Sequence, residues 1–183
     1  MPMGVLTKTL IGISLAATWL VPGRAAAAES SPASLAVIGF ELDDDHPDPV
    51  RALQLRDRLT AIQKQLEKGL HDQGLYRVVD TAAAKDLIDA LYERHSFVYR
   101  CNACFGEVGQ RLDTRLVAVG WVQRVSELIL NVNVSIRDAQ TDTEILSKSV
   151  DLRGNTNETW TRAMNFMLRD WAERRARNPR YGQ

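Results

Sequence analysis

Residues 128–138 alternate between apolar and polar side chains, and this pattern constrains the fold more than any other feature of the chain. The apolar positions are Leu128, Leu130, Val132, Val134 and Ile136, and the polar positions are Asn131, Asn133, Ser135 and Arg137. Successive side chains of a strand point to opposite faces, so this segment predicts a strand with one buried and one polar face. Residues 114–125, apolar on both sides, and residues 144–154 predict two neighbouring strands. Because the connections are short, we expect an antiparallel meander.

Upstream of the meander, predicted strands alternate with predicted helices. Residues 34–42 and 75–80 are short apolar runs, which is typical of strands. Apolar residues at mostly three- and four-residue steps over 53–70 predict an amphipathic helix, and the alanine-rich segment 81–95 predicts a second one. A short helix is expected around residues 105–112.

A last helix is expected to begin after Asn155, because Asn155 and Glu158 have the spacing of a capping box. Its inner stripe is Trp160, Met164, Met167 and Trp171. The resulting order, β-α-β-α-α-β-β-β-α, predicts an α+β fold in which helices pack on a mixed, mostly antiparallel sheet.

The amino-terminal residues have the layout of a secretory signal peptide. A lysine precedes an apolar run of residues 10–21, and small residues follow at 25–28. We therefore expect a signal peptide at residues 1–28, a single α+β domain at 29–173 and a charged flexible tail at 174–183. This organisation predicts export to the periplasm and no transmembrane segment after signal cleavage.

The net charge of the exported chain does not indicate nucleic-acid binding. Removing Lys8 and Arg24 leaves 21 of 23 basic residues against 23 acidic residues, a net charge of 21 − 23 = −2. A basic patch is the usual electrostatic signature of nucleic-acid binding. We therefore expect a protein partner in the cell envelope and no nucleic acid.

The chain resembles a family of small exported proteobacterial proteins that is known only as a domain of unknown function. The similar stretches are "LAVIGFEL", "CNACFGEVGQRL" and the segment from "GWVQRV" to "MNFML", which together cover roughly residues 35–169. More distantly, "AVIGFEL", "LVAVGWV" and "SIRDAQTDTEI" are similar to the amino-terminal domain of TolB and to the curli-export lipoprotein group. The resemblance implies the α+β fold and, through relatives, a link to quinoprotein alcohol oxidation.

Cys101 and Cys104, the only cysteines, form a Cys-x-x-Cys motif. Covalent haem attachment is excluded because Phe105 stands where a histidine ligand is required. Because an exported chain meets an oxidising compartment, we expect a local disulfide that stabilises the fold modestly. A thiol–disulfide redox centre and free thiols stay open, as does a metal site in which His95 and a distant acidic residue join the pair.

The remaining polar features do not assemble a catalytic set. The acidic loop at residues 43–48 lacks the spacing of a calcium loop, and the sequence contains neither a nucleophile elbow nor a glycine-rich phosphate loop. The polar face of Asn131, Asn133, Ser135 and Arg137 is the candidate surface for a ligand or partner, and a merely solvated face is the alternative. We expect no cofactor and no metal.

These observations favour a non-catalytic periplasmic accessory or binding domain that acts on another envelope protein. The alternative functions are a periplasmic thiol–disulfide redox protein that uses the cysteine pair, and a carrier for a small molecule or a metal.

Overall fold

The computed structural model describes residues 1, 4, 31–45 and 47–183. The predicted signal peptide lies almost entirely outside the described residues, and so does His46 of the acidic loop. Among the described residues, none of the helices combines the length and the apolar composition that a membrane crossing requires.

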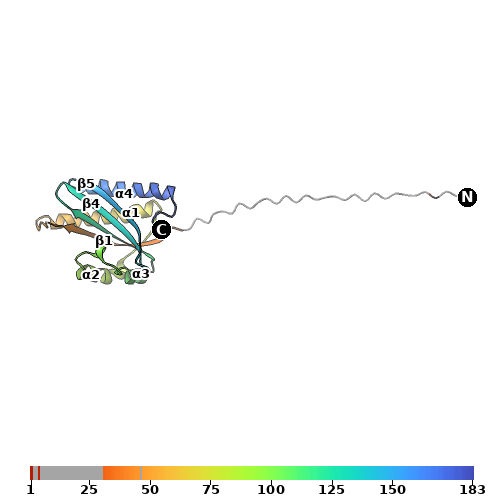
Figure 1. The fold of residues 1–183 in the computed structure, drawn as a ribbon, viewed down its shortest axis with the longest axis horizontal. Coiled ribbons are helices and arrows are strands. Elements are labelled where there is room, and N and C mark those ends of the chain that lie inside the picture. Colours follow the sequence, from red (N-terminus) through yellow and green to blue (C-terminus); the bar gives the residue numbers. More distant parts are fainter. Residues whose placement is uncertain (2–3, 5–30, 46) are drawn as a thin grey trace. The chain divides into compact units, whose positions relative to one another are not determined.

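The elements follow the predicted order and confirm the α+β class (Figure 1). They are β1 (Ser34–Asp44), α1 (Ala52–Asp72), β2 (Arg77–Val79), the 3-10 turn η1 (Ala82–Ala84), α2 (Lys85–Arg94), the 3-10 turn η2 (Val98–Arg100), α3 (Gly106–Arg111), β3 (Leu116–Arg124), β4 (Ile129–Asp138), β5 (Glu144–Arg153) and α4 (Asn157–Arg177).

The five strands form one mixed sheet in the order β2-β1-β3-β4-β5. β1 pairs in parallel with β2 and with β3, whereas β3, β4 and β5 form the predicted antiparallel meander with the longest ladders. Because β1 is inserted between β2 and β3, β5 lies at one edge of the sheet.

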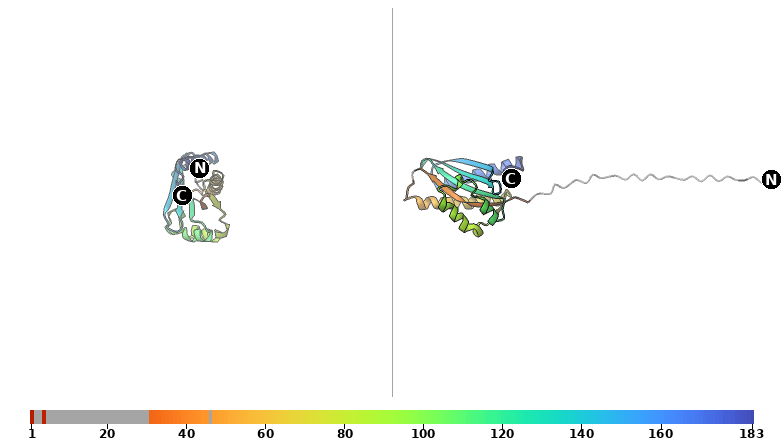
Figure 2. Two further views of the ribbon diagram at one scale, coloured as in Figure 1. Left: turned by 90° about the vertical axis from the view of Figure 1, so that its right-hand side faces the viewer. Right: turned by 60° about the horizontal axis from the view of Figure 1, so that its bottom comes forward.

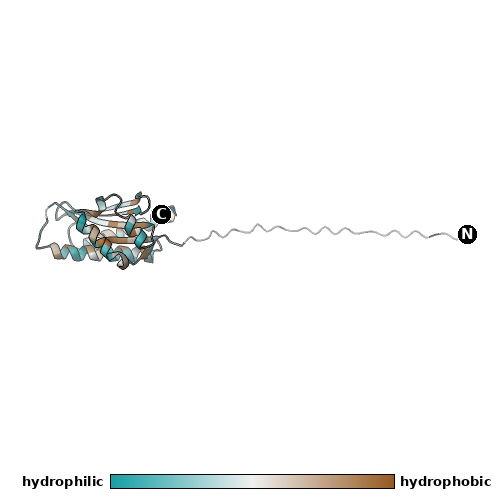
Figure 3. Cartoon of the chain, turned by 90° about the horizontal axis from the view of Figure 1, so that it is seen from below, coloured by the Kyte–Doolittle hydropathy of each residue, from teal (hydrophilic) through white to brown (hydrophobic). Residues whose placement is uncertain are grey.

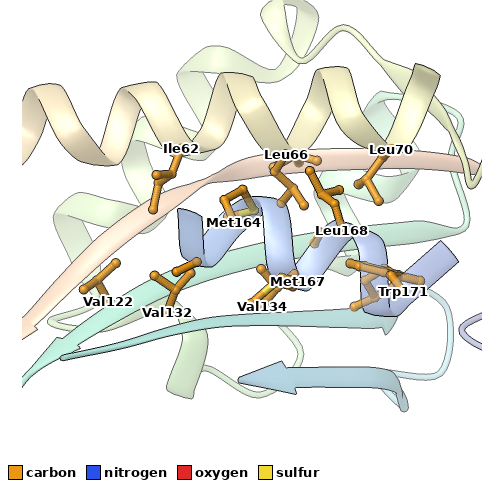
Figure 4. Close-up of a cluster of buried hydrophobic side chains, with 14 of the residues drawn as sticks. Ile62, Leu66, Leu70, Val122, Val132, Val134, Met164, Met167, Leu168 and Trp171 are labelled. Atoms are coloured by element: carbon orange, nitrogen blue, oxygen red, sulfur yellow. The ribbon is translucent and has the colours of Figure 1, made fainter. Parts of the chain in front are cut away.

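One face of the sheet packs against α1 and α4 and contains the larger core (Figure 1). Figure 4 shows side chains of α1, α4, β3 and β4 pointing toward one another in this layer. The predicted inner stripe of α4 is confirmed, since its four members are buried, namely Trp160, Met164, Met167 and Trp171. The apolar residues of β4 from Leu130 to Ile136 lie in the same core, whereas Leu128 is exposed in the turn before the strand.

The opposite face of the sheet is covered by α2, α3 and the turns between them. The end-on view in Figure 2 shows this green segment apart from the blue helix α4. A second cluster joins Ala36, Ile38, Val117 and Val119 of the sheet to apolar residues of this layer. In Figure 3 the helices carry both hydrophobic and hydrophilic residues, as expected for helices with one side on a sheet.

A bulge in β1 changes which side chains face the α2 layer. The pairing of β1 with β3 shifts between Val37 and Phe40, where Gly39 has a positive φ of 142°. This backbone conformation strains any residue with a Cβ, and a Cβ at Gly39 would also lie 2.8 Å from the Tyr92 hydroxyl oxygen, so the position favours glycine. After the bulge Phe40 packs on the larger core, and the alternation therefore directs Glu41 and Asp43 toward the α2 layer.

The amino-terminal cap of α4 differs from the sequence-based expectation. The cap is Thr156, which forms a capping box with Thr159. Asn155 does not cap the helix, because its Oδ1 accepts hydrogen bonds from Arg58 at 2.7 Å and from the Trp160 indole at 3.0 Å. Its side chain thus ties α1 to the start of α4.

The carboxy-terminal residues lie against the domain. α4 continues to Arg177, past position 174, which is the predicted start of the tail. The Tyr76 hydroxyl donates to the carbonyl of Gly182, and Arg175 donates to the carbonyl of Tyr181 at 2.6 Å. These contacts place the chain end beside β2 and α4.

Candidate functional site

Glu41 holds the segment that precedes the cysteines. Its carboxylate accepts hydrogen bonds from the backbone N–H groups of Val98 at 3.0 Å and of Tyr99 at 2.7 Å. Burial raises the pKa of Glu41, and the two N–H donors act in the opposite direction. A single side chain from the sheet therefore fixes the backbone of η2.

Asp43 and Trp121 hold the same segment through side chains. The Tyr99 hydroxyl donates to Asp43 at 2.6 Å, and Arg100 pairs with Asp43 at 3.0 Å. Burial raises the pKa of Tyr99 to about 12, so its hydroxyl stays a donor at neutral pH. The Tyr99 ring stacks on Trp121 of β3 with centroids 4.3 Å apart and planes at 4°.

The structure brings Cys101, Cys104 and His95 together. The cysteines form a close pair with Cα atoms 5.8 Å apart, a separation that a disulfide accommodates. The Nε2 atom of His95, the residue after α2, lies 3.8 Å from the Cys101 sulfur and 3.5 Å from the Cys104 sulfur. The disulfide stays a prediction. The contact of His95 with both sulfurs is seen only in the structure, because the sequence merely made His95 one candidate to join the pair.

Ala103, between the cysteines, adopts a backbone conformation that is rare for residues with a Cβ. Its φ is 62°, and its N–H donates to the Asp142 carboxylate at 2.7 Å. Asp142 lies in the turn between β4 and β5, so the turn anchors the far side of the cysteine segment. Strained backbone of this kind is held in place by the contacts around it.

Replacing Ala103 by glycine is expected to raise the free energy of unfolding by about 0.5–1 kcal/mol, because glycine removes the left-handed strain. Urea unfolding of Ala103→Gly and the wild type measures this difference. The control is Ala139→Gly, at a neighbouring position without positive φ, which is expected to lower stability. A loss of stability in Ala103→Gly would contradict the described loop conformation.

The predicted polar face of β4 is less open than the alternation suggested. Asn133 and Ser135 are buried, with Ser135 donating to Glu144 at 2.7 Å. Asn131 donates to Asp151 of β5. Arg137 donates to the Asp142 carbonyl at 2.9 Å and pairs with its carboxylate at 3.2 Å, which links this face to the cysteine segment. Its role as a ligand or partner face stays a prediction.

The acidic residues of the predicted loop take part in ion pairs in the structure. Asp43 pairs with Arg100, and Asp44 pairs with Arg124 at 2.8 Å. Over residues 31–45 and 47–183, the one group with the spacing of metal ligands is His95, Cys101 and Cys104.

The edge strand β5 has an open side. The N–H of Gly154 donates to the Leu128 carbonyl, which makes Ile129 and Arg153 a non-hydrogen-bonded pair of the antiparallel ladder. Hydrogen-bonded pairs alternate with such pairs, so Val150 bonds to Val132 of β4 while Ser149 directs its N–H and C=O away from the sheet. Within the described part of the chain, no strand pairs with these outward groups.

A groove runs between this edge and α4. Its lining is apolar at the centre and charged at the sides, with Val150, Leu152, Ala163, Phe166, Asp151, Arg153, Arg162 and Arg169. Phe166 is 51% exposed, and the Arg169 guanidinium lies over its ring at 5.5 Å. Three arginines against one aspartate make the lining basic.

This groove was not among the predicted sites. Arg162, Phe166 and Arg169 recur at four- and three-residue steps on the helix face beside the buried stripe. That spacing is visible in the sequence, and it marks an exposed aromatic residue between two arginines. Because β5 lies at the edge of the sheet, these three side chains line a groove beside it.

The family profile of DUF3280, described as "Protein of unknown function (DUF2380)", matches residues 33–171. This confirms the predicted resemblance to an uncharacterised family. No curated protein matches the sequence.

Several solved structures are similar to this chain. The LpoB C-terminal domain from Salmonella enterica has a TM-score of 0.50 at 9% identity, covering 69% of this chain and 87% of that chain. Lipoprotein GNA1162 from Neisseria meningitidis has a TM-score of 0.50 at 15% identity, covering 80% and 98%. TolB from Acinetobacter baumannii has a TM-score of 0.45 at 12% identity, covering 82% of this chain and 29% of that chain. At these identities the first two similarities show the fold alone.

Proposed function

Since the chain belongs to DUF3280, a family of proteins of unknown function, we propose that it is a non-catalytic periplasmic accessory domain that binds another envelope protein. The partner contributes an extended, acidic segment that adds to the sheet at β5 and fills the groove beside α4. The observation that carries the proposal is an open sheet edge with an apolar and basic groove next to it.

The edge supplies directional main-chain contacts. Ser147, Ser149, Asp151 and Arg153 all belong to non-hydrogen-bonded pairs with β4, so each directs its N–H and C=O outward. An added strand pairs with such groups, and pockets beside the edge select its alternate side chains. The exposed ring of Phe166 and the side chain of Val150 provide an apolar contact for one of those side chains.

The charges of the groove select the class of partner. Arg153 and Arg169 take part in no ion pair within the described residues, and Arg162 pairs only with the exposed Glu158. Exposed pairs contribute little, so these arginines remain available for carboxylates of a partner. Complementary charge accelerates encounter and disfavours partners of the wrong sign.

A second copy of this chain fits the groove poorly. Symmetric pairing of two β5 strands would bring the Arg162 and Arg169 side chains of both copies to the same face of the joined sheet. Like charges brought together in this way disfavour the association of two copies, whereas an acidic segment is attracted to them. The favoured occupant is therefore a different, acidic protein.

Photo-crosslinking in intact cells tests this proposal. p-Benzoylphenylalanine in place of Phe166 is expected to give one discrete adduct with another envelope protein. The matched control is the same probe at Phe97, which lies in the α2 layer. The ring of Phe97 also lies beneath an arginine, since the Arg100 guanidinium is 4.6 Å from its centroid. An adduct supports the proposal only if Arg162→Glu removes it. Adducts from Phe97 alone, no adduct from Phe166, or a crosslinked second copy of the chain would each contradict the proposal.

A further inference from the structure

His95, Cys101 and Cys104 have the geometry of three ligands around one metal ion. Their candidate ligand atoms all lie within 4.8 Å of one another. Around one tetrahedral ion, a thiolate sulfur and an imidazole nitrogen are about 3.6 Å apart, given metal–ligand distances of about 2.3 and 2.1 Å. The observed separations of His95 Nε2 from the two sulfurs are 3.5 and 3.8 Å.

The surrounding structure holds this arrangement from both sides. Glu41 binds the backbone at Val98 and Tyr99, and Asp142 binds the backbone at Ala103. Phe105, directly after the second cysteine, is buried in the core beneath α3. The loop is thus positioned by contacts that do not depend on a bond between the sulfurs. Only the two sulfurs must move, to about 3.8 Å from each other, to share an ion.

We infer that the reduced protein binds one monovalent copper ion through the two cysteine thiolates and the Nε2 atom of His95. Soft thiolate ligands select monovalent copper, zinc or iron–sulfur clusters. Structural zinc sites are closed by four protein ligands, and zinc on two thiolates and one imidazole requires water as a fourth ligand. Monovalent copper is saturated by three soft ligands, and the described residues offer three here. A three-ligand set with two thiolates therefore favours copper. This site is independent of the β5 groove and extends the function beyond partner binding.

The site forms only when the cysteines are reduced. A dithiol reductant passes two electrons and two protons to the cysteine pair, so that the bond between the sulfurs breaks and the reductant itself becomes a disulfide. The copper ion then displaces the two thiol protons, forms two copper–sulfur bonds and accepts the lone pair of the neutral imidazole. Two protons are released for each copper ion bound.

Competition against a chromophoric chelator of monovalent copper, bathocuproine disulfonate, tests the inference under anaerobic conditions. The reduced protein is expected to retain one copper ion per chain, and the oxidised protein none. His95→Ala and Cys104→Ser are each expected to weaken binding at least about tenfold, since even second-shell losses cost 10–100-fold. The matched control, His71→Ala on the exposed side of α1, is expected to bind as the wild type does.

The outcomes distinguish a metal site from a disulfide that only stabilises the fold. Circular dichroism and thermal unfolding of each reduced variant show whether it is folded, and His95→Gln provides a second histidine variant of similar size. The inference is overturned if the reduced wild type retains no copper or if folded His95 variants bind equally well. It is also overturned if zinc displaces copper from the reduced protein.

Discussion

Val150→Pro is expected to lower the free energy of unfolding by about 3 kcal/mol, whereas Ser149→Pro lowers it by less than about 1 kcal/mol. Val150 belongs to a hydrogen-bonded pair with Val132, so proline there removes a ladder bond and leaves an acceptor without its donor. Proline at Ser149 removes an N–H that points away from the sheet, and edge strands accept proline at such positions.

Urea unfolding of the two proline variants measures this difference, with Val150→Ala and Ser149→Ala as controls for the lost side chains. For about 150 folded residues, 3 kcal/mol corresponds to a fall of about 6–12 °C in Tm. Equal losses at the two positions would contradict the assignment of outward and inward backbone groups on β5, and with it the open edge on which the proposed function depends.

The double variant Arg162→Glu, Arg169→Glu is expected to weaken partner binding by at least about 30-fold, equivalent to about 2 kcal/mol. Both side chains line the groove, so their reversal replaces attraction for an acidic segment by repulsion. Stability is expected to change by less than about 1 kcal/mol, because both arginines are exposed. The wild-type interaction is expected to weaken with rising salt, since screening acts on exposed charges.

The measurement is the yield of the Phe166 crosslink in cells and in extracts of rising ionic strength. The matched control, Arg56→Glu with Lys64→Glu on exposed positions of α1, changes the net charge equally but leaves the groove intact. An equal loss in both double variants would show that net charge, and not the groove, governs the interaction.

The sequence predicted the order and type of the elements because periodicity reports burial directly. Alternation in residues 128–138 and the stripe of Trp160, Met164, Met167 and Trp171 each mark one buried face, and both faces are buried as expected. Family membership was likewise recognisable from segments that turned out to be β1, β3 and the β4–β5 hairpin.

The candidate sites depended on contacts that no local pattern contains. The bulge at Gly39 turns Glu41 toward η2, and a one-residue shift of this kind exchanges the faces of a strand. Thr156 caps α4 in place of the predicted Asn155, because the Asn155 side chain accepts a hydrogen bond from Arg58, which is distant in sequence. The edge position of β5 follows from the insertion of β1 into the sheet, which only the folded chain reveals.

The most direct test of the central claim is the crosslink yield from p-benzoylphenylalanine at Phe166 in a chain that also carries Ser149→Pro. This substitution removes one outward N–H of β5 and leaves the apolar and arginine side chains of the groove and the ladder with β4 in place. If an extended partner segment adds to β5, the adduct disappears although the protein stays folded. An undiminished adduct in the folded variant would show that the partner does not pair with the β5 edge.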